Sequence, residues 1–325
     1  MQRREYIGAT ISALGTGFLA GCTGDTSTHE GTTTPTAQPD KAAEHLEEAG
    51  SALQSAGEQL SSESESLSES EFEDGSVDFN PSKVYTYLDE AANELDAAEE
   101  YSTDEQRSKI NSGREYIEFG RKITDFLDIV VEGYSLVYSG LTYFQSERYT
   151  DAAAELEAAE QKLGDADDLL SVVRDRTSQL ETEELDDFDK VDAETLQIDL
   201  TTLDELIPVL ETMATGIREM SLGMEDLNEA ESYLDEEALT QAQKALDRAA
   251  EHFGTSESLF KRQEGESPSS IKSTFIELTC YAGSLKDGTE HFSRAVEAIG
   301  EGDNERAKEE RDKASESYNK CNFDS

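Results

Sequence analysis

Apolar residues recur at alternating spacings of three and four positions from Asp40 to the C-terminal end of the chain. That spacing places one narrow apolar stripe on a helix and leaves its other faces to acidic and polar side chains. Three such stripes run from Val84 through Leu88, Ala91 and Leu95 to Ala98, from Tyr149 through Ala152 to Val173, and from Ile271 to Ile299. No convincing segment of period two appears, and the chain holds only 5 prolines. We therefore expect an all-α protein with helices over residues 40–67, 81–101, 103–147, 150–181, 192–234, 236–261, 268–300 and 303–321.

Local signals for helix ends agree with this pattern. Asn80-Pro81 and Ser267-Pro268 each combine an N-cap residue with proline at the first helical position. The sequence Thr-Asp-Glu-Gln over residues 103–106 is typical of a capping box. Pro208 falls inside the fifth expected helix, and we expect it to kink or split that helix, because proline lacks an N–H donor and clashes with the preceding turn.

The expected helix over residues 103–147 differs from the others because its apolar residues cover more than one face. A helix of this kind belongs at the centre of a helical assembly. Glycines along it would let neighbouring helices approach closely: Gly113, Gly120, Gly133 and Gly140. Its aromatic residues could alternatively line a ligand pocket, but we favour core packing.

Two stretches of the chain align on each other without gaps. The first consists of Gly140, Tyr143, Tyr149, Ala152, Leu156 and Ala159, and the second of Ala230, Tyr233, Leu239, Ala242, Leu246 and Ala249. A third copy, from Ala295 to Ala314, keeps the turn and both alanines but has Arg311 where leucine is expected. This order of small, aromatic and bulky residues resembles a tetratricopeptide helix pair, in which small residues lie where two helices touch.

The resemblance covers only part of the chain. The copies do not follow the family's regular period of about 34 residues, and several expected helices are longer than the family's. The resemblance implies antiparallel helical hairpins. The sequence leaves open whether they form a tetratricopeptide-like array or a bundle of long helices.

The first 22 residues have the three parts of an export signal. Arg3 and Arg4 form a twin-arginine pair, residues 7–20 form a modest apolar segment, and Leu-Ala-Gly before Cys22 is typical of a lipobox. The apolar segment is too short to span a hydrocarbon core of about 30 Å. We expect a signal peptide over residues 1–22, a lipid on Cys22, a flexible Thr-rich tether over 23–39 and an all-helical domain over 40–325.

The net charge of the chain indicates the salt environment in which it works. Asp and Glu total 74 against 27 Lys and Arg, a net charge of −47. Repulsion on this scale opposes compaction in dilute salt, but at molar salt the Debye length falls to about 3 Å and the repulsion is screened. With the twin-arginine signal and the lipobox, this composition resembles that of a secreted haloarchaeal lipoprotein. The resemblance implies a location on the extracellular face of the cytoplasmic membrane, and so acidic a surface disfavours nucleic acid as a partner.

Two cysteines remain once Cys22 is assigned to lipid. If the last hairpin turns near residue 301, Cys321 falls opposite roughly residue 281, and Cys280 lies at about the right height to bond it. Cys280 lies off the main apolar stripe of its helix, but an oxidising exterior permits the bond. A disulfide between Cys280 and Cys321 is therefore possible.

No catalytic or metal-binding motif stands out in the chain. None of the four histidines is paired at ligand spacing: His29, His45, His252 and His291. The densest acidic loop, over residues 186–192, lacks the glycine and the closing glutamate of an EF-hand. We expect no metal, no cofactor and no enzymatic activity.

Three functions remain open. The leading hypothesis is a non-catalytic interaction or scaffold protein that is anchored to the membrane through Cys22 and binds a protein or polymer. The second is a structural spacer of the cell envelope without a specific ligand. The third is an enzyme whose site is assembled from scattered carboxylates.

Overall fold

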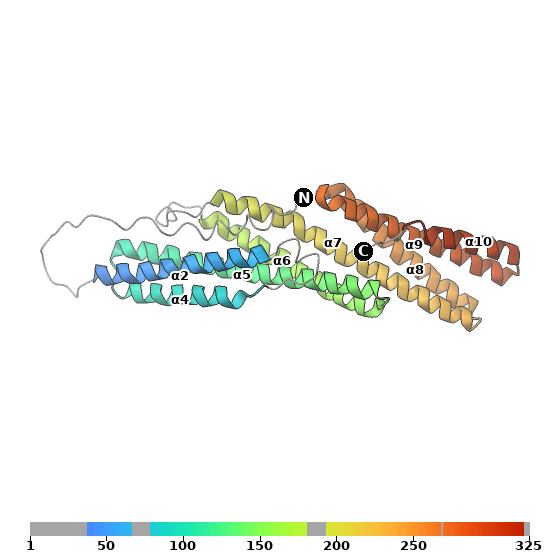
Figure 1. Cartoon of the computed structure of the whole chain (residues 1–325), viewed down its shortest axis with the longest axis horizontal. Coiled ribbons are helices and arrows are strands. Elements are labelled where there is room, and N and C mark those ends of the chain that lie inside the picture. The colour runs from blue at the N-terminus through green and yellow to red at the C-terminus, as the bar shows by residue number, and fades with distance from the viewer. Residues whose placement is uncertain (1–37, 67–78, 181–192, 268, 322–325) are drawn as a thin grey trace. The chain divides into compact units, whose positions relative to one another are not determined.

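The computed structural model describes residues 38–66, 79–180, 193–267 and 269–321 (Figure 1). Those residues form helices and the turns between them, without a strand, so the all-α prediction is confirmed. Within those ranges, none of the helices combines the length and the hydropathy that a membrane span requires. The helices are α2 (Pro39–Ser66), α4 (Pro81–Glu99), α5 (Asp104–Gln145), α6 (Tyr149–Leu180), α7 (Ala193–Asp235), α8 (Leu239–Glu266), α9 (Ser269–Glu301) and α10 (Asn304–Tyr318).

Two helix starts have the caps that the sequence predicts. Asn80 Oδ1 accepts a hydrogen bond from the Ser82 N–H at 3.1 Å, and Pro81 is the first residue of α4. Thr103 and Gln106 form a reciprocal capping box before α5: the Thr103 N–H donates to Gln106 Oε1 at 3.0 Å, and the Gln106 N–H donates to Thr103 Oγ1 at 3.3 Å. These bonds satisfy N–H groups that have no helical acceptor, and so fix where α4 and α5 begin.

The predicted apolar stripes form the buried faces of the helices. On α4, the five stripe residues are the five buried ones: Val84, Leu88, Ala91, Leu95 and Ala98. On α6, every stripe residue from Ala152 to Val173 is at most 1% exposed. Ile299 of α9 is the exception, because it is 39% exposed and Ala295, Val296 and Ala298 supply the buried face there instead.

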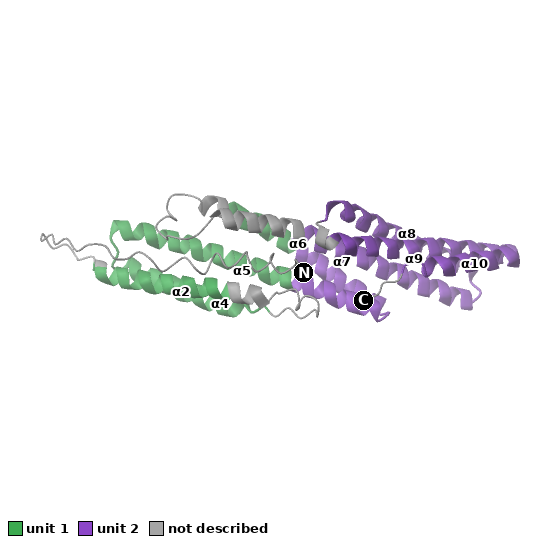
Figure 2. Ribbon diagram, turned by 45° about the horizontal axis from the view of Figure 1, so that its top comes forward, with its two compact units in different colours: residues 1–131, 165–204 green, residues 132–164, 205–325 purple. Residues whose placement is uncertain are grey.

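The helices pack into two compact units (Figure 2). Unit 1 holds α2, α4, α5 as far as Val131, α6 from Asp165 and α7 as far as Asp204. Unit 2 holds the remaining parts of α5, α6 and α7 together with α8, α9 and α10.

In unit 1, α5 lies against both α4 and α6. Gly113 of α5 faces Leu95 of α4, and Glu118 of α5 accepts a hydrogen bond from Arg176 of α6 at 2.7 Å. Phe119 and Phe126 of α5 are each 1% exposed. The broad apolar surface of this helix is therefore buried between neighbours, as expected from its sequence.

In unit 2, three hairpin turns share one backbone geometry. They join α5 to α6, α7 to α8 and α9 to α10, and each places one residue at positive φ: Glu147 (60°), Glu237 (58°) and Gly302 (78°). The N–H of the next residue donates to a carbonyl five positions earlier, at 2.9 Å (Arg148 to Tyr143), 2.8 Å (Ala238 to Tyr233) and 2.9 Å (Asp303 to Ala298). This is the Schellman arrangement, which satisfies the last carbonyls of a helix.

The repeat predicted from the sequence is therefore present as three hairpins. The small residues lie at the same places around each turn and are buried: Gly140 and Ala152, Ala230 and Ala242, Ala295 and Ala307. The third copy adopts the same turn even though the leucine position carries the exposed Arg311.

Glycines set how closely the helices of a hairpin approach. A Cβ on Gly140 would lie 2.5 Å from Leu156 Cγ, a contact that folded proteins essentially never show. Other glycines face bulky partners in the same way: Gly113 and Leu95, Gly120 and Leu88, Gly133 and Leu163, Gly216 and Phe260, Gly223 and Phe253. Each of these helix pairs has two such contacts. From the first contact to the second, the glycine number rises by seven and the partner number falls by seven, as antiparallel helices require. The close approach predicted for the glycines of α5 is confirmed.

One of the two effects expected of Pro208 is absent from α7, and α8 ends later than expected. α7 continues through Pro208 without a break, so the proline does not split the helix. Pro208 is exposed, and water can satisfy the carbonyl that proline leaves without a donor. α8 ends at Glu266 rather than near residue 261, because Gln263 still packs inward and accepts a hydrogen bond from Thr212 of α7 at 3.3 Å.

A disulfide closes the last hairpin. It joins Cys280 of α9 to Cys321, which follows α10, with the Cα atoms 5.9 Å apart. Cys280 occupies an exposed position on α9, away from the buried Phe275 and Leu278. The bond therefore attaches the end of α10 to the middle of α9 from outside the apolar core.

Gly140→Ala should destabilise the protein relative to Gly164→Ala. Both substitutions gain helix propensity of about 1 kcal/mol, but a Cβ at position 164 meets nothing within 4 Å, whereas one at position 140 collides with Leu156. Overpacking of this kind costs about 1–3 kcal/mol. Urea denaturation in molar KCl should show a difference of this size in the free energy of unfolding. Equal stabilities would contradict the close approach of α5 and α6.

Replacing both Cys280 and Cys321 with serine should lower the free energy of unfolding. The cross-link spans a sequence separation of 41 residues, and its chain-entropy contribution for a loop of this size is about 4 kcal/mol. Thiol titration in a Cys22→Ala background checks the bond itself. The unfolded, unreduced protein should show no reactive thiol, and two free thiols before reduction would exclude the bond.

Candidate functional site

Three histidines each contact a glutamate on a neighbouring helix. The pairs join α2 to α4, α8 to α7 and α9 to α10, and in each the imidazole Nδ1 lies 2.7 Å from a carboxylate oxygen: His45 and Glu94, His252 and Glu219, His291 and Glu310. The sequence does not reveal these pairs, because it does not state which residues of two antiparallel helices lie at the same height.

Two of the histidines lie among basic side chains. The Nε2 of His252 lies 3.7 Å from Asp226, whose carboxylate also pairs with Arg248 at 2.6 Å. The glutamate that contacts His291 also pairs with Lys313 at 2.8 Å. In both places a carboxylate near the histidine also pairs with an arginine or a lysine, so these groups are ion-pair networks that connect adjacent helices.

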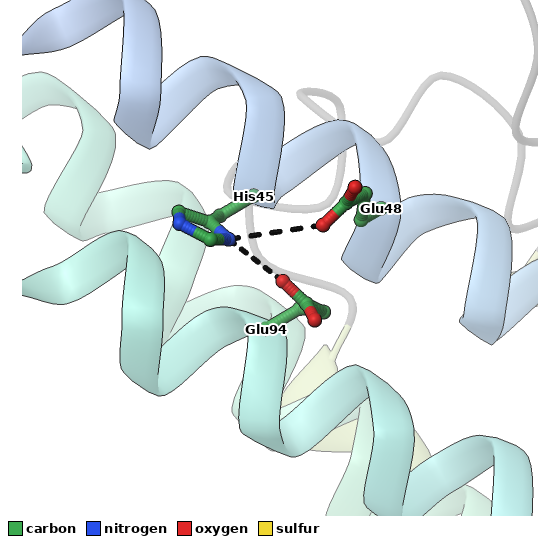
Figure 3. Close-up of side chains that lie close together, drawn as sticks. All are labelled: His45, Glu48 and Glu94. Atoms are coloured by element: carbon green, nitrogen blue, oxygen red, sulfur yellow. Dashed lines mark hydrogen bonds and ion pairs between the residues drawn. The ribbon is translucent and has the colours of Figure 1, made fainter.

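The surroundings of His45 are more acidic. Glu48 lies one turn further along α2, with its Oε2 3.8 Å from the His45 Nδ1, and Glu94 reaches the same nitrogen from α4 (Figure 3). One ligand atom from each of the three side chains lies within 4.8 Å of the other two. Among the residues that the structure describes, this is the one group of His, Cys, Asp and Glu side chains whose ligand atoms lie close enough together to contact one metal ion.

Tyr101, which follows α4, packs against the His45 ring. The two rings stack with centroids 6.2 Å apart and planes 12° from parallel. Lys41, one turn before His45, places its ammonium 5.0 Å over the Tyr101 ring. The imidazole is thus held between α2 and the end of α4, with Nδ1 directed toward both carboxylates (Figure 3).

Glu48 and Glu94 lie close enough to affect each other's charge. The pKa of Glu48 is raised above its ordinary value, first because its carboxyl shares a hydrogen bond with Glu94 and second because the charge of Glu94 is nearby. A shared proton is one way to relieve such repulsion, and a bound cation is another. The three side chains keep 29%, 57% and 27% of their exposure (His45, Glu48, Glu94), so the group is open to solvent.

The candidate residues taken from the sequence have different outcomes. Arg3, Arg4 and Cys22 lie outside the described residues, as does the acidic loop over 186–192. Cys280 and Cys321 are brought together. The buried aromatic residues of α5 belong to the cores of the two units, which supports core packing over a ligand pocket.

Sequence reasoning missed the group around His45. The signal that was available is the spacing of His45 and Glu48, which places both on one face of a helix, one turn apart. The third member, Glu94, becomes a candidate only when the register of α2 against α4 is known.

Comparisons with known proteins add no family: no family model, no curated protein and no solved structure matches the chain. The role of each site therefore has to be inferred from its own chemistry.

Glu310→Gln should change how stability depends on pH. The pKa of Glu310 is lowered to about 2, first by Lys313 and second by His291. Because the folded pKa lies below the unfolded value of 4.5, the carboxylate stabilises the fold above that value and loses this contribution as pH falls toward 2. Wild type should be the more stable protein at neutral pH, and the difference should shrink between about pH 5 and pH 2.

Denaturation at several pH values and constant salt measures this difference. The exposed Glu316 on the same helix provides a control, because Glu316→Gln removes the same charge. A Glu310→Gln deficit that stays constant down to pH 2 would contradict the pairing with Lys313 and His291.

Proposed function

We propose that the chain is a lipid-anchored interaction or scaffold protein that acts outside the cell of a halophile, without catalysis. The lipobox that ends at Cys22, directly after a twin-arginine signal, carries this proposal. A lipid on that cysteine and a Thr-rich tether over residues 23–39 would hold the helical units beyond the membrane headgroups.

The three hairpins of unit 2 support an interaction role. They share a turn and a small-and-large packing pattern with the helix pairs of tetratricopeptide proteins, a class of repeat protein that presents extended binding surfaces. Outside their buried residues, the helices of these hairpins carry exposed polar residues that are available to a partner.

Charge indicates the chemistry of that partner. With a net charge of −47, the surface favours basic or neutral segments of a protein or polymer over nucleic acid and anionic lipid. The same charge suits molar salt, where screening removes most of the self-repulsion.

Cys22→Ala should release the protein from the membrane. The substitution removes the thiol that would carry the lipid, and one acyl chain contributes about 0.8 kcal/mol per buried methylene. Fractionation of cells that express each form should find wild type with membranes and the variant in the medium. Thr33→Ala, in the tether, serves as the control. Equal membrane association of wild type and Cys22→Ala would contradict the anchor.

Chemical cross-linking on intact cells in molar salt separates an interaction protein from a spacer. An interaction protein should give a reproducible cross-linked partner that is lost when residues 205–325 are deleted, whereas a spacer should give none. The absence of any such partner would contradict the interaction role and favour the structural one.

A further inference from the structure

We propose that His45, Glu48 and Glu94 form a binding site for one divalent first-row transition cation, of the chemistry of Zn²⁺, that bridges α2 and α4. Neither the lipid anchor nor the binding of a partner requires this site, so the inference goes beyond the proposed function.

The distances in the site suit such an ion. Zn²⁺ binds nitrogen and carboxylate oxygen at about 2.0–2.2 Å, so ligand atoms around a tetrahedral ion lie about 3.3–3.5 Å apart. The His45 Nδ1 lies 2.7 Å from Glu94 Oε2 and 3.8 Å from Glu48 Oε2, values on either side of that spacing. All three ligand atoms lie within 4.8 Å of one another, so one ion could contact all of them.

The ligand types determine which cation the site prefers. One imidazole nitrogen and two carboxylates suit Zn²⁺ and its first-row neighbours, whereas Ca²⁺ and Mg²⁺ prefer oxygen ligands alone. The two carboxylate charges balance a dication, and water can complete its coordination.

Tyr101 supplies part of the preorganisation that a metal site needs. Its ring stacks on the imidazole of His45, whose Nδ1 already faces the two carboxylates without an ion, and this contact restricts rotation of the imidazole. His291 is the matched contrast: its Nδ1 also lies 2.7 Å from one glutamate, but that carboxylate is paired with Lys313. A lysine ammonium at that position repels a metal ion.

Titration of the mature, detergent-solubilised protein with Zn²⁺ tests the proposal. Molar KCl and excess Ca²⁺ occupy the many other carboxylates, so binding that persists belongs to a site with nitrogen. Wild type should bind one Zn²⁺ per chain, and His45→Gln and Glu94→Gln should weaken binding by roughly tenfold or more. His291→Gln should bind as wild type does.

Thermal unfolding gives an independent reading. Zn²⁺ should raise the unfolding midpoint of wild type and of His291→Gln, but not that of His45→Gln, because an ion that binds only the folded state stabilises it. Glu48→Gln provides a second test if a variant of the α2–α4 contact fails to fold, since Glu48 is the most exposed member of the site. The proposal would be overturned if His45→Gln and Glu48→Gln bound Zn²⁺ as tightly as wild type does. It would also be overturned if His291→Gln weakened binding equally, or if Ca²⁺ abolished binding.

Discussion

The contact between a small residue on one helix and a bulky residue on its antiparallel neighbour is the constraint on which both units depend. Gly140 against Leu156 in unit 2 and Gly113 against Leu95 in unit 1 leave no room for a Cβ. Because these contacts recur every seven residues in opposite directions, they fix the register of a hairpin as well as its separation. Register in turn decides which polar side chains meet at the edges of the apolar seam, as Lys162 of α6 and Glu132 of α5 do at 2.7 Å beside the contact of Gly133 with Leu163.

The apolar seams carry most of the stability, because many of the ion pairs at their edges are open to solvent. In the pairs of Arg114 with Asp96 and of Arg306 with Glu297, each side chain keeps at least 38% of its exposure. Such pairs contribute about 0–1 kcal/mol each, and salt weakens them further. In brine the acidic coat therefore serves solubility, while burial of leucine, alanine and phenylalanine holds the helices together.

Features that depend on a single helix can be predicted from the sequence. The α4 stripe, the capping box at Thr103 and the glycines of α5 follow from periodicity and side-chain chemistry, and each was found in its expected role. The end of α8 and the exposure of Ile299 were missed, because they depend on what the neighbouring helix offers. The site at His45 was missed for the same reason. His45 and Glu48 share a helix, but Glu94 lies on α4 and comes close only because α2 packs against α4.

Selectivity is the difficulty that a metal site on such a chain must overcome, since 74 acidic residues compete for every cation. Carboxylates on mobile, exposed side chains bind monovalent and divalent ions weakly and with little discrimination, because each ion keeps most of its water. The imidazole of His45 stacks against Tyr101 and faces two carboxylates, so it adds a nitrogen ligand that most of the other acids lack. Because the ligands come from α2 and α4, the free energy of binding also adds to that of helix pairing. Occupancy would then be coupled to the stability of unit 1, and a mutation that weakens the α2–α4 contact should weaken metal affinity even where it leaves all three ligands intact.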